Sequence, residues 1–394
     1  MANVTTNLPG ADQFVLQSTI GAYTDEAYTN AKKLTGTAIV GDNPMISTDT
    51  ETFIGQMRWM KPLNPVVNNA SLTDATDGQK TSYSSDYATY VKAARTHGAE
   101  KVNLQSLVTG QDGLAKISRD FSETRTQDEH NALLSILKGV AISEALLGAG
   151  NASGQVGLGG QTFDNDPKSK RNGFYVDLGA SKSIVDATSA IQGAARAENF
   201  LKAFGMAYKD YEPEFAYLVT SPETMASLRS ANLVDQTTVT EGSVTFTTIF
   251  GGKFRLIQTR ASQGMSTAEL AKVNGGGGVD IVGTKTSFIV LPGSLAMRSL
   301  AVPDAVEITR DGNKYKGGGV TSIWYRWGFV MHPAGYSWAG SQEDFASDAA
   351  YKSAIVAGTP TALTAVADAT TASGTWTRKT DSVLSLGILP VFHS

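Results

Sequence analysis

The stretch GGGVTSIWYRWGFVMHPAGYSW, residues 317–338, decides the fold of this chain. After three glycines it continues from Val320 to Met331 without proline or a polar turn sequence. Two sets of side chains alternate along it: Thr321, Ile323, Tyr325, Trp327, Phe329 and Met331 on one face, and Ser322, Trp324, Arg326 and Val330 on the other. Alternation with period two predicts a β-strand. At about 3.3 Å per residue the strand would reach roughly 40 Å, whereas ordinary strands have about five or six residues.

The composition is that of a large protein with an unusually uncharged surface. The chain has 394 residues, a formal net charge of −4, 40 glycines and no cysteine. Its length exceeds that of a single compact core, so we expect more than one domain. Charged residues make up 18% of the chain, against about 25% in typical proteins. We therefore expect much of the surface to be covered by something other than water. The absence of cysteine excludes disulfides and thiolate metal sites.

The N-terminal region and the apolar segments favour a soluble intracellular protein. No lysine or arginine precedes Lys32, so neither a signal peptide nor a basic nucleic-acid-binding arm is predicted. The first forty residues have weak periodicity, which predicts an extended arm. The most apolar long segment, Ala132 to Ala149, is interrupted by Lys138 and Glu144, so we expect it not to span a membrane.

One long helix is predicted from Thr126 to Leu147. Thr126 and Glu129 have the spacing of a capping box, which satisfies backbone N–H groups of a first turn. Apolar residues then recur at helical spacing: Leu133, Ile136, Leu137, Val140 and Leu147. The helix would be about 33 Å long at 1.5 Å per residue. Its end is predicted at the glycine-rich sequence GAGNASGQVGLGGQ, residues 148–161.

Further elements indicate a second, mixed α/β region. A strand over Tyr83–His97 follows turn sequences, so residues 59–97 predict a hairpin-like loop. A second helix is predicted to begin at Asp186. A third should begin at Ser221-Pro222-Glu223, in the order of N-cap, N1 proline and first-turn acid, and end near Asn232. Strands are predicted at 214–221, 251–260 and in the closing segment 375–392.

The sequence does not assemble the residues of an active site. The four histidines, His97, His130, His332 and His393, lie far apart, and none belongs to a Glu-x-x-His pair. We expect a helix-capping or surface role for His130, in the first turn of the long helix, and a packed or hydrogen-bonded side chain for His332. The glycine-rich segments 148–160 and 273–287 lack P-loop and dinucleotide-binding spacing. Asp164 and Asp166 lack the further ligands of a calcium loop. We therefore expect no enzyme, no catalytic, cofactor-binding or metal-ligating residues, and no cofactor.

Four segments, in order, resemble one known family. They are HGAEKVNLQSLVTGQDGLAKISRDFSETRTQDEHNALLSILKGV (97–140), SPETMASLRSANLVD (221–235), VEITRDGNKYKGGGVTSIWYRWGFVMHPAGYSW (306–338) and TWTRKTDSVLSLGILP (375–390). Together they resemble the major capsid proteins of tailed bacteriophages, which have the Hong-Kong-97-type fold that encapsulins also use. The likeness extends from about Arg58 to Pro390, and its specific part is the order of the segments.

The resemblance implies an α+β fold with six parts. These are an N-terminal arm (1–50), an extended loop (51–113), a peripheral domain with a long spine helix (114–180), an axial α/β domain (181–300), the long strands of the peripheral domain (301–340) and a C-terminal segment that returns to the axial domain (341–394).

The resemblance also implies a structural function and particular partners. The chain would self-assemble, as hexamers and pentamers, into an icosahedral head shell enclosing double-stranded DNA, located in the virion and, during assembly, in the host cytoplasm. Its partners would be copies of itself, a portal, a separate scaffolding protein and weakly contacted DNA, with no membrane. One alternative is the shell of an encapsulin-like compartment with a protein cargo. A second, from another class, is a glycine-rich α/β hydrolase or sugar-binding protein.

Overall fold

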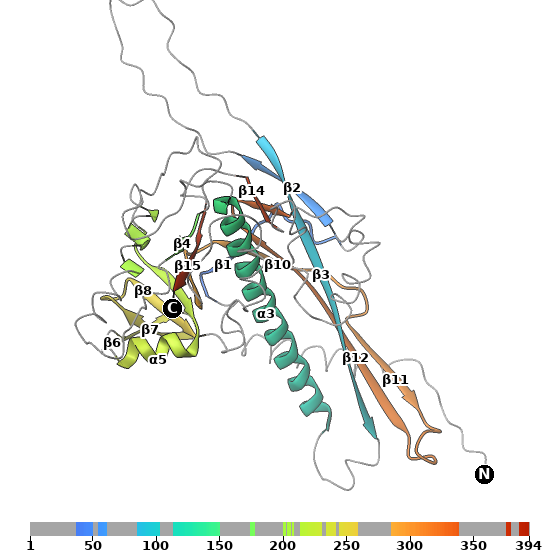
Figure 1. Cartoon of the computed structure of the whole chain (residues 1–394). Helices are drawn as coiled ribbons and strands as arrows, with labels where there is room; N and C mark the ends of the chain where they lie inside the picture. The colour runs from blue at the N-terminus through green and yellow to red at the C-terminus, as the bar shows by residue number, and fades with distance from the viewer. Residues whose placement is uncertain are drawn as a thin grey trace, which may run out of the picture.

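The protein is α+β, as expected, with one long helix between two β-sheets (Figure 1). The structure is a computed structural model, and it describes residues 37–49, 54–60, 85–102, 113–149, 174–177, 200–208 without 202 and 206, 213–230, 234–241, 244–258, 285–338, 376–379 and 386–393. Outside these residues lie most of the expected N-terminal arm, most of the extended loop and most of the glycine-rich segments.

The first sheet is built around the long strand that the sequence predicted. It contains, in spatial order, β1 (Val40–Gly41), β10 (Leu295–Ser299), β12 (Val320–Pro333), β3 (Ser85–Val102) and β2 (Ile54–Met60), with β11 (Val306–Asp311) also paired to β12. The strand expected at 83–97 is longer than predicted, with 18 residues. It continues because its second half stays paired antiparallel with β12, as far as the pair Val102↔Val320.

The two faces of β12 differ as the alternation predicted. In its first half Ile323, Tyr325 and Trp327 are buried, whereas Trp324 is exposed. In the second half both faces are buried, because Val330 packs into a small separate cluster with Ile46, Met57, Ala88 and Tyr90. The strand is therefore half-buried at its start and fully enclosed at its end.

The long helix is confirmed, but its predicted beginning is wrong. Helix α3 extends over Gly113–Ala149, 37 residues, or about 55 Å at 1.5 Å per residue. Thr126 lies inside it, and its Oγ1 donates a hydrogen bond to the Ser122 carbonyl 2.9 Å away, so it is not a cap. After Gly113, the helical segment before Thr126 contains no glycine or proline, and it places Phe121 in the core. Tertiary packing thus carries the helix past a local start signal.

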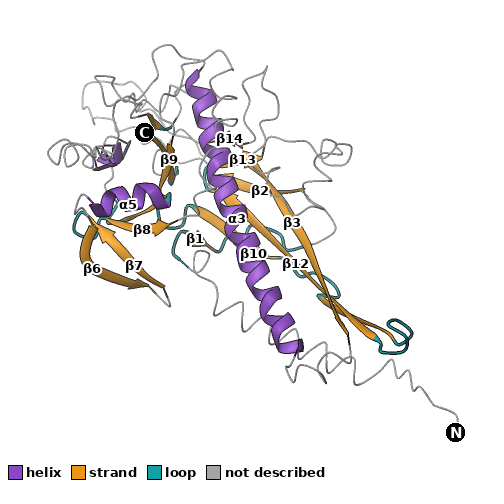
Figure 2. Cartoon of the chain, turned by 60° about the horizontal axis from the view of Figure 1, so that its bottom comes forward, coloured by secondary structure: helices purple, strands orange, loops and turns teal. Residues whose placement is uncertain are grey.

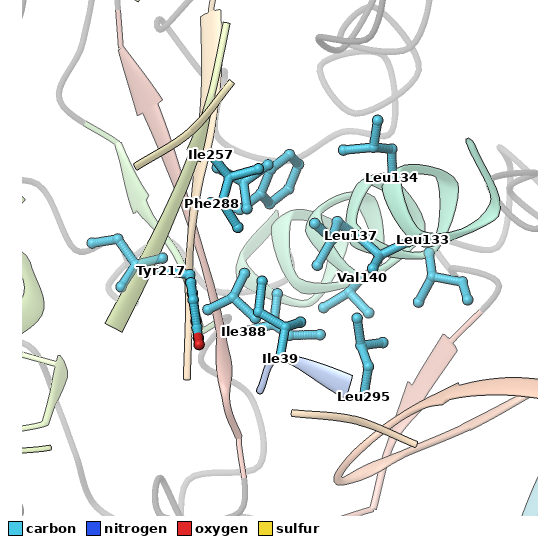
Figure 3. Packing of buried hydrophobic residues seen from close by; sticks show 14 of the residues in the cluster. Ile39, Leu133, Leu134, Leu137, Val140, Tyr217, Ile257, Phe288, Leu295 and Ile388 are labelled. Atoms are coloured by element: carbon cyan, nitrogen blue, oxygen red, sulfur yellow. The ribbon is translucent and has the colours of Figure 1, made fainter. Parts of the chain in front are cut away.

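The apolar stripe of α3 belongs to the cores of both sheets. Leu133, Leu137 and Val140 are fully buried. Figure 3 shows them beside Ile39 and Leu295, which lie at the first sheet, and facing Ile388 of the second. Figure 2 shows the same arrangement from another direction, with α3 lying along the long strands. The helix therefore joins the two sheets through one continuous core.

The second sheet is the mixed α/β part of the chain. Its seven strands are, in spatial order, β4 (Val176–Asp177), β15 (Ile388–His393), β9 (Lys285–Val290), β5 (Ala216–Thr220), β8 (Phe254–Gln258), β7 (Val244–Ile249) and β6 (Val234–Glu241). Strand β5 pairs parallel with β8 and antiparallel with β9. The C-terminal strand β15 thus lies in this sheet, whereas β10, at the end of the segment 181–300, lies in the first.

The helix predicted at Ser221 is confirmed. Helix α5 (Pro222–Ser230) begins directly after Ser221, whose Oγ accepts a hydrogen bond from the Thr224 backbone N–H at 3.3 Å. It ends at Ser230, two residues before the predicted end, with Met225 and Leu228 buried. The start of the helix predicted at Asp186 lies outside the described residues.

A cavity at the shared core should be costly. We expect Leu137→Ala to lower the free energy of unfolding by about 2–5 kcal/mol, because the fully buried leucine fills space between α3 and both sheets. Denaturant unfolding followed by circular dichroism measures this loss. Gln127→Ala, at an exposed position of the same helix, is the control and should change stability by less than about 0.5 kcal/mol. Equal stability of the two variants would contradict this packing.

Candidate functional site

The four histidines do not form a site. His97 on β3 packs edge-on against Phe121, with ring centroids 5.4 Å apart, and His393 on β15 shares a 2.8 Å hydrogen bond between Nε2 and Ser287 Oγ. His332, at the end of β12, is buried and lies edge-on to a tryptophan ring, as expected for a packed side chain. For His130 a helix-capping or surface role was expected; it lies in the interior of α3 with a half-buried side chain, so the capping alternative is wrong.

Other candidate motifs cannot be placed. Asp164, Asp166 and nearly all of the two glycine-rich segments lie outside the described residues; of those segments, 148–149 end α3 and 285–287 begin β9. Within the described ranges, no group of three or more histidine, aspartate or glutamate side chains could hold a metal ion. None of the described helices is long and apolar enough to cross a membrane.

The described part of the chain instead concentrates its buried charges along α3. We use the word joint for a buried ionic contact between α3 and another part of the chain. The first joint is at Glu144, which is fully buried. Its Oε2 accepts hydrogen bonds from the Phe174 backbone N–H at 2.6 Å and from Arg378 Nη1 at 3.1 Å. Burial raises the pKa of the Glu144 carboxyl, although Arg378 opposes the rise. Burial also raises the pKa of the Tyr336 hydroxyl, and the Glu144 charge adds to that rise.

This joint, which we call the Glu144 joint, ties distant parts of the chain together. Arg378 belongs to β14 (Trp376–Arg378), which pairs antiparallel with β13 (Tyr336–Trp338). Strand β13 follows β12 in the sequence. The Trp376 backbone N–H donates to Ser143 Oγ at 3.1 Å, one residue before Glu144. Three regions, α3, residue 174 and the β13–β14 pair, therefore meet at one carboxylate.

Two further joints fix α3 to the long strands. Asp128 accepts hydrogen bonds from Arg95 on β3 at 3.4 Å and from Trp327 Nε1 on β12 at 3.2 Å. Burial raises the pKa of Asp128, and the Arg95 charge opposes this. One turn earlier, Arg125 donates to Glu129 at 3.2 Å and to the Tyr325 hydroxyl at 2.9 Å. These contacts fix the position of the helix along the strands, since a shift would leave buried charges unpaired.

The sequence contained partial signals for these joints. Glu144 stood out only as a charge interrupting an apolar helical segment, and such a residue needs a buried cation. Trp376 and Arg378 are two residues apart in a predicted strand, so both lie on the same face. Arg378 is therefore a candidate for the buried cation that Glu144 needs. The pairing of Arg95 with Asp128 had no local signal, because it depends on how β3 lies against α3.

The exposed large apolar side chains among the described residues form a second set of candidates. They are Met45, Tyr87, Tyr315 and Trp324. Two of them lie at the far end of the long strands: Trp324 on β12, and Tyr315 in the loop that connects β11 to β12. Tyr315 and Lys316 both have left-handed backbone φ angles, 55° and 54°, which L-residues rarely adopt. Tyr315 and Trp324 are therefore exposed aromatic side chains at one end of the described long strands.

Comparisons with known proteins give distant structural likenesses. No family model matches the chain, and no curated protein matches it. The chain is similar to a structure described as the head of Helicobacter pylori bacteriophage KHP40, with TM-score 0.44 and 8% identity over 92% of this chain and 90% of that one. It is also similar to the capsid of Ralstonia phage GP4, with TM-score 0.41 and 10% identity over 75% and 83% of the two chains. For the mature capsid of bacteriophage PhiM1 the TM-score is 0.42 and the identity 11%, over 73% and 81%.

Breaking the Glu144 joint should destabilise the protein strongly. We expect Arg378→Ala to cost about 3–5 kcal/mol of unfolding free energy, because it leaves a fully buried carboxylate without its cation. The control is Arg119→Ala, which removes an exposed ion pair with Glu123 one turn away on α3 and should cost less than about 0.5 kcal/mol. Urea unfolding of both variants tests this, and a small effect at Arg378 would refute the joint.

The buried His332 should make stability fall in acid. Burial lowers the pKa of His332 to about 4, below its ordinary value of 6.5. The folded state therefore favours the neutral ring, and its contribution is complete above pH 6.5 and lost as pH falls toward 4. The loss should approach roughly 3 kcal/mol, since one pKa unit corresponds to about 1.4 kcal/mol.

A non-titrating aromatic ring isolates this effect. We expect His332→Phe to keep the contact with Trp376 and to flatten the pH dependence of unfolding between pH 6.5 and 4, measured in urea at several pH values. An unchanged slope in the variant would mean that His332 is not the titrating group.

Proposed function

We propose that this chain is the major capsid protein of a tailed bacteriophage, a structural protein that assembles into the icosahedral shell around double-stranded DNA. The observation that carries the proposal is the length of its central elements. Helix α3 has 37 residues and β3 has 18, against usual means of about 11–12 and 5–6. Both lie lengthwise in one elongated layer (Figures 1 and 2).

An elongated layer of this kind suits a shell better than a catalyst. A shell subunit must cover area with little thickness and contact several neighbours at its edges. An enzyme of this length would instead enclose a concave pocket lined with converging polar groups. Asp128, Glu129 and Glu144, the buried or partly buried carboxylates of α3, are used in joints between α3 and the strands, which stiffen the layer. The motif resemblance and the low charge content, 18% of residues, support the same function.

The finer assignments are part of this proposal. The shell would consist of hexamers and pentamers of the chain, with a portal and a separate scaffolding protein as partners, and would form in the host cytoplasm. The net charge of −4 suits weak, non-specific contact with packaged DNA, because tight binding of phosphates requires clustered basic residues. We also propose the six-part division at residues 1–50, 51–113, 114–180, 181–300, 301–340 and 341–394, with no catalytic, cofactor or metal site.

Assembly is the direct test. Co-expressed with its proposed scaffolding protein, the chain should sediment as closed particles, visible as uniform shells by electron microscopy. A monomer or small oligomer under the same conditions would refute the proposal. Shells that enclose a dedicated protein and no DNA in their native host would indicate the encapsulin-like alternative.

The N-terminal residues should matter for assembly more than for folding, with a boundary that the structure revises. The weak periodicity of the first forty residues predicted an extended arm, but Ile39 is fully buried and β1 pairs with β10. Hydrogen bonds from the Gly293 and Leu295 backbone N–H groups to Ala38 and Ile39 also hold this segment.

We therefore place the truncation before Thr37. Deleting residues 2–36 should leave a soluble subunit with the circular dichroism of the full chain but no closed shells in sedimentation. Deleting residues 2–41 should in addition lower the unfolding midpoint, because Ile39 and β1 are lost. Normal shells from the shorter deletion would show that residues 2–36 are dispensable for assembly.

A further inference from the structure

The long strands end in a three-stranded tongue with two different faces. The tongue consists of residues 92–102 of β3, residues 320–330 of β12 and all of β11, held in register by antiparallel pairing. One face packs on α3 through buried side chains such as Tyr325 and Trp327. The other, which we call the outer face, carries exposed or half-buried residues: Thr96, Gly98, Glu100, Glu307, Thr309, Ser322, Trp324 and Arg326.

The centre of the outer face is a tryptophan held flat by a glycine. Trp324 is 44% exposed and lies directly opposite Gly98 in the register of β12 and β3. A Cβ added at Gly98 would meet the Trp324 ring at 2.7 Å, so the ring rests on the bare backbone of β3. Glycine weakens the interior of a strand and often marks a close approach. Here Gly98 leaves room for a large aromatic side chain to lie against the strand. Large aromatic side chains dominate the energy of many interfaces.

Glu100 and Arg326, which have opposite charges, lie on the two sides of this ring along the strands, each in an ion pair within its own chain. Toward the tip, Glu100 accepts a 3.3 Å hydrogen bond from Ser322 and lies 3.9 Å from Lys314. Toward the body, Arg326 pairs with Glu307 and donates to the Asp304 carbonyl at 2.9 Å.

The register separates the two ends of the outer face. Arg326 lies opposite Thr96, and Glu100 lies opposite Ser322. The two charged side chains are thus four residues apart, about 13 Å at 3.3 Å per residue, and do not contact each other within one chain.

We propose that the outer face binds the outer face of a second copy of this chain, with a two-fold axis across the strands at Trp324. Such a rotation reverses the strand direction, so it brings the two Trp324 rings together. It also places Arg326 of each copy over Ser322 of the other, one strand away from Glu100, which lies opposite Ser322. The two side chains of opposite charge therefore lie on facing sides of the contact in both copies, as an isologous contact requires. The inference rests on the proposed function, since the contact would join neighbouring subunits of the shell.

The size of the tongue predicts a weak contact. Three strands about 4.8 Å apart and six residues long cover roughly 300 Å² per copy, whereas a stable complex buries about 800 Å² per partner. The contact should therefore form only when other interfaces hold the subunits together, as in a closed shell, where linked weak contacts reinforce each other.

Charge reversal distinguishes this contact from a structural role of the same residues. Glu100→Arg should lower the yield of closed particles at least tenfold, because it places arginines one strand away from Arg326 of the second copy. Arg326→Glu should do the same, and the double variant Glu100→Arg with Arg326→Glu should restore the yield. Within one chain the two residues are too far apart to compensate. Circular dichroism and the unfolding midpoint show that each subunit is folded.

The matched control is Glu223→Arg on α5. Glu223 is, like Glu100, an exposed carboxylate paired with a lysine, with 67% and 60% of their side chains exposed. Glu223→Arg should leave particle yield within about twofold of the unchanged chain, because surface charges away from an interface contribute little. No rescue by the double variant, or equal losses at Glu100 and Glu223, would overturn the inference.

Cross-linking tests the register directly, because the chain has no cysteine of its own. In assembled particles, Trp324→Cys should give covalent dimers with a short bismaleimide, since position 324 lies on the axis. Thr96→Cys, exposed on the same face but two residues from the axis, should not, because its two copies would be about 13 Å apart along the strands and on opposing sheets. Particles without a dimer at position 324 would overturn this contact and leave the proposed shell function intact. Failure of the unchanged chain to form particles would refute the shell function itself.

Discussion

The structure depends on one helix whose apolar stripe is shared by two sheets. Leu133, Leu137 and Val140 of α3 lie in a single core with residues of the long-stranded sheet and of the seven-stranded sheet. A helix that served only one sheet could be short, since three turns bury enough surface to hold it. A helix that joins two sheets along the length of β12 must extend over the whole layer. The length of α3, the separation of the sheets and the elongated outline of the described chain all follow from this constraint.

The buried ionic joints fix the position of α3 along the strands, which apolar packing alone does not fix. Apolar contacts permit a helix to slide by a turn, because one leucine can replace another, whereas a buried carboxylate must meet its own partner. Asp128 fixes α3 to β3 and β12 near the tongue. Glu144 fixes the other end to residue 174 and to β14, more than two hundred residues away in the sequence.

Much of the fold followed from local sequence patterns, and what did not follow depends on tertiary contacts. The faces of β12 were predictable because alternation of period two is a local property, and the start of α5 because Ser221 caps its own helix. The start of α3 was not, since the capping-box spacing at Thr126 is outweighed by the packing of Phe121. The Glu144 joint was only partly predictable. A charge in an apolar segment requires a partner, but the sequence does not say that Arg378 is that partner. The contact of the Trp324 ring with Gly98 depends on strand register, which no local pattern of the sequence contains.

A shell subunit must have a defined orientation in the wall as well as the ability to assemble. If the described chain is a shell subunit, the layer formed by α3, β3 and β12 must lie within the wall of the particle. Electron cryomicroscopy of assembled particles tests this most directly. We predict a closed icosahedral shell in which α3 is tangential to the surface in every subunit. Particles in which α3 points along the radius, or a small oligomer with no closed wall, would contradict the account.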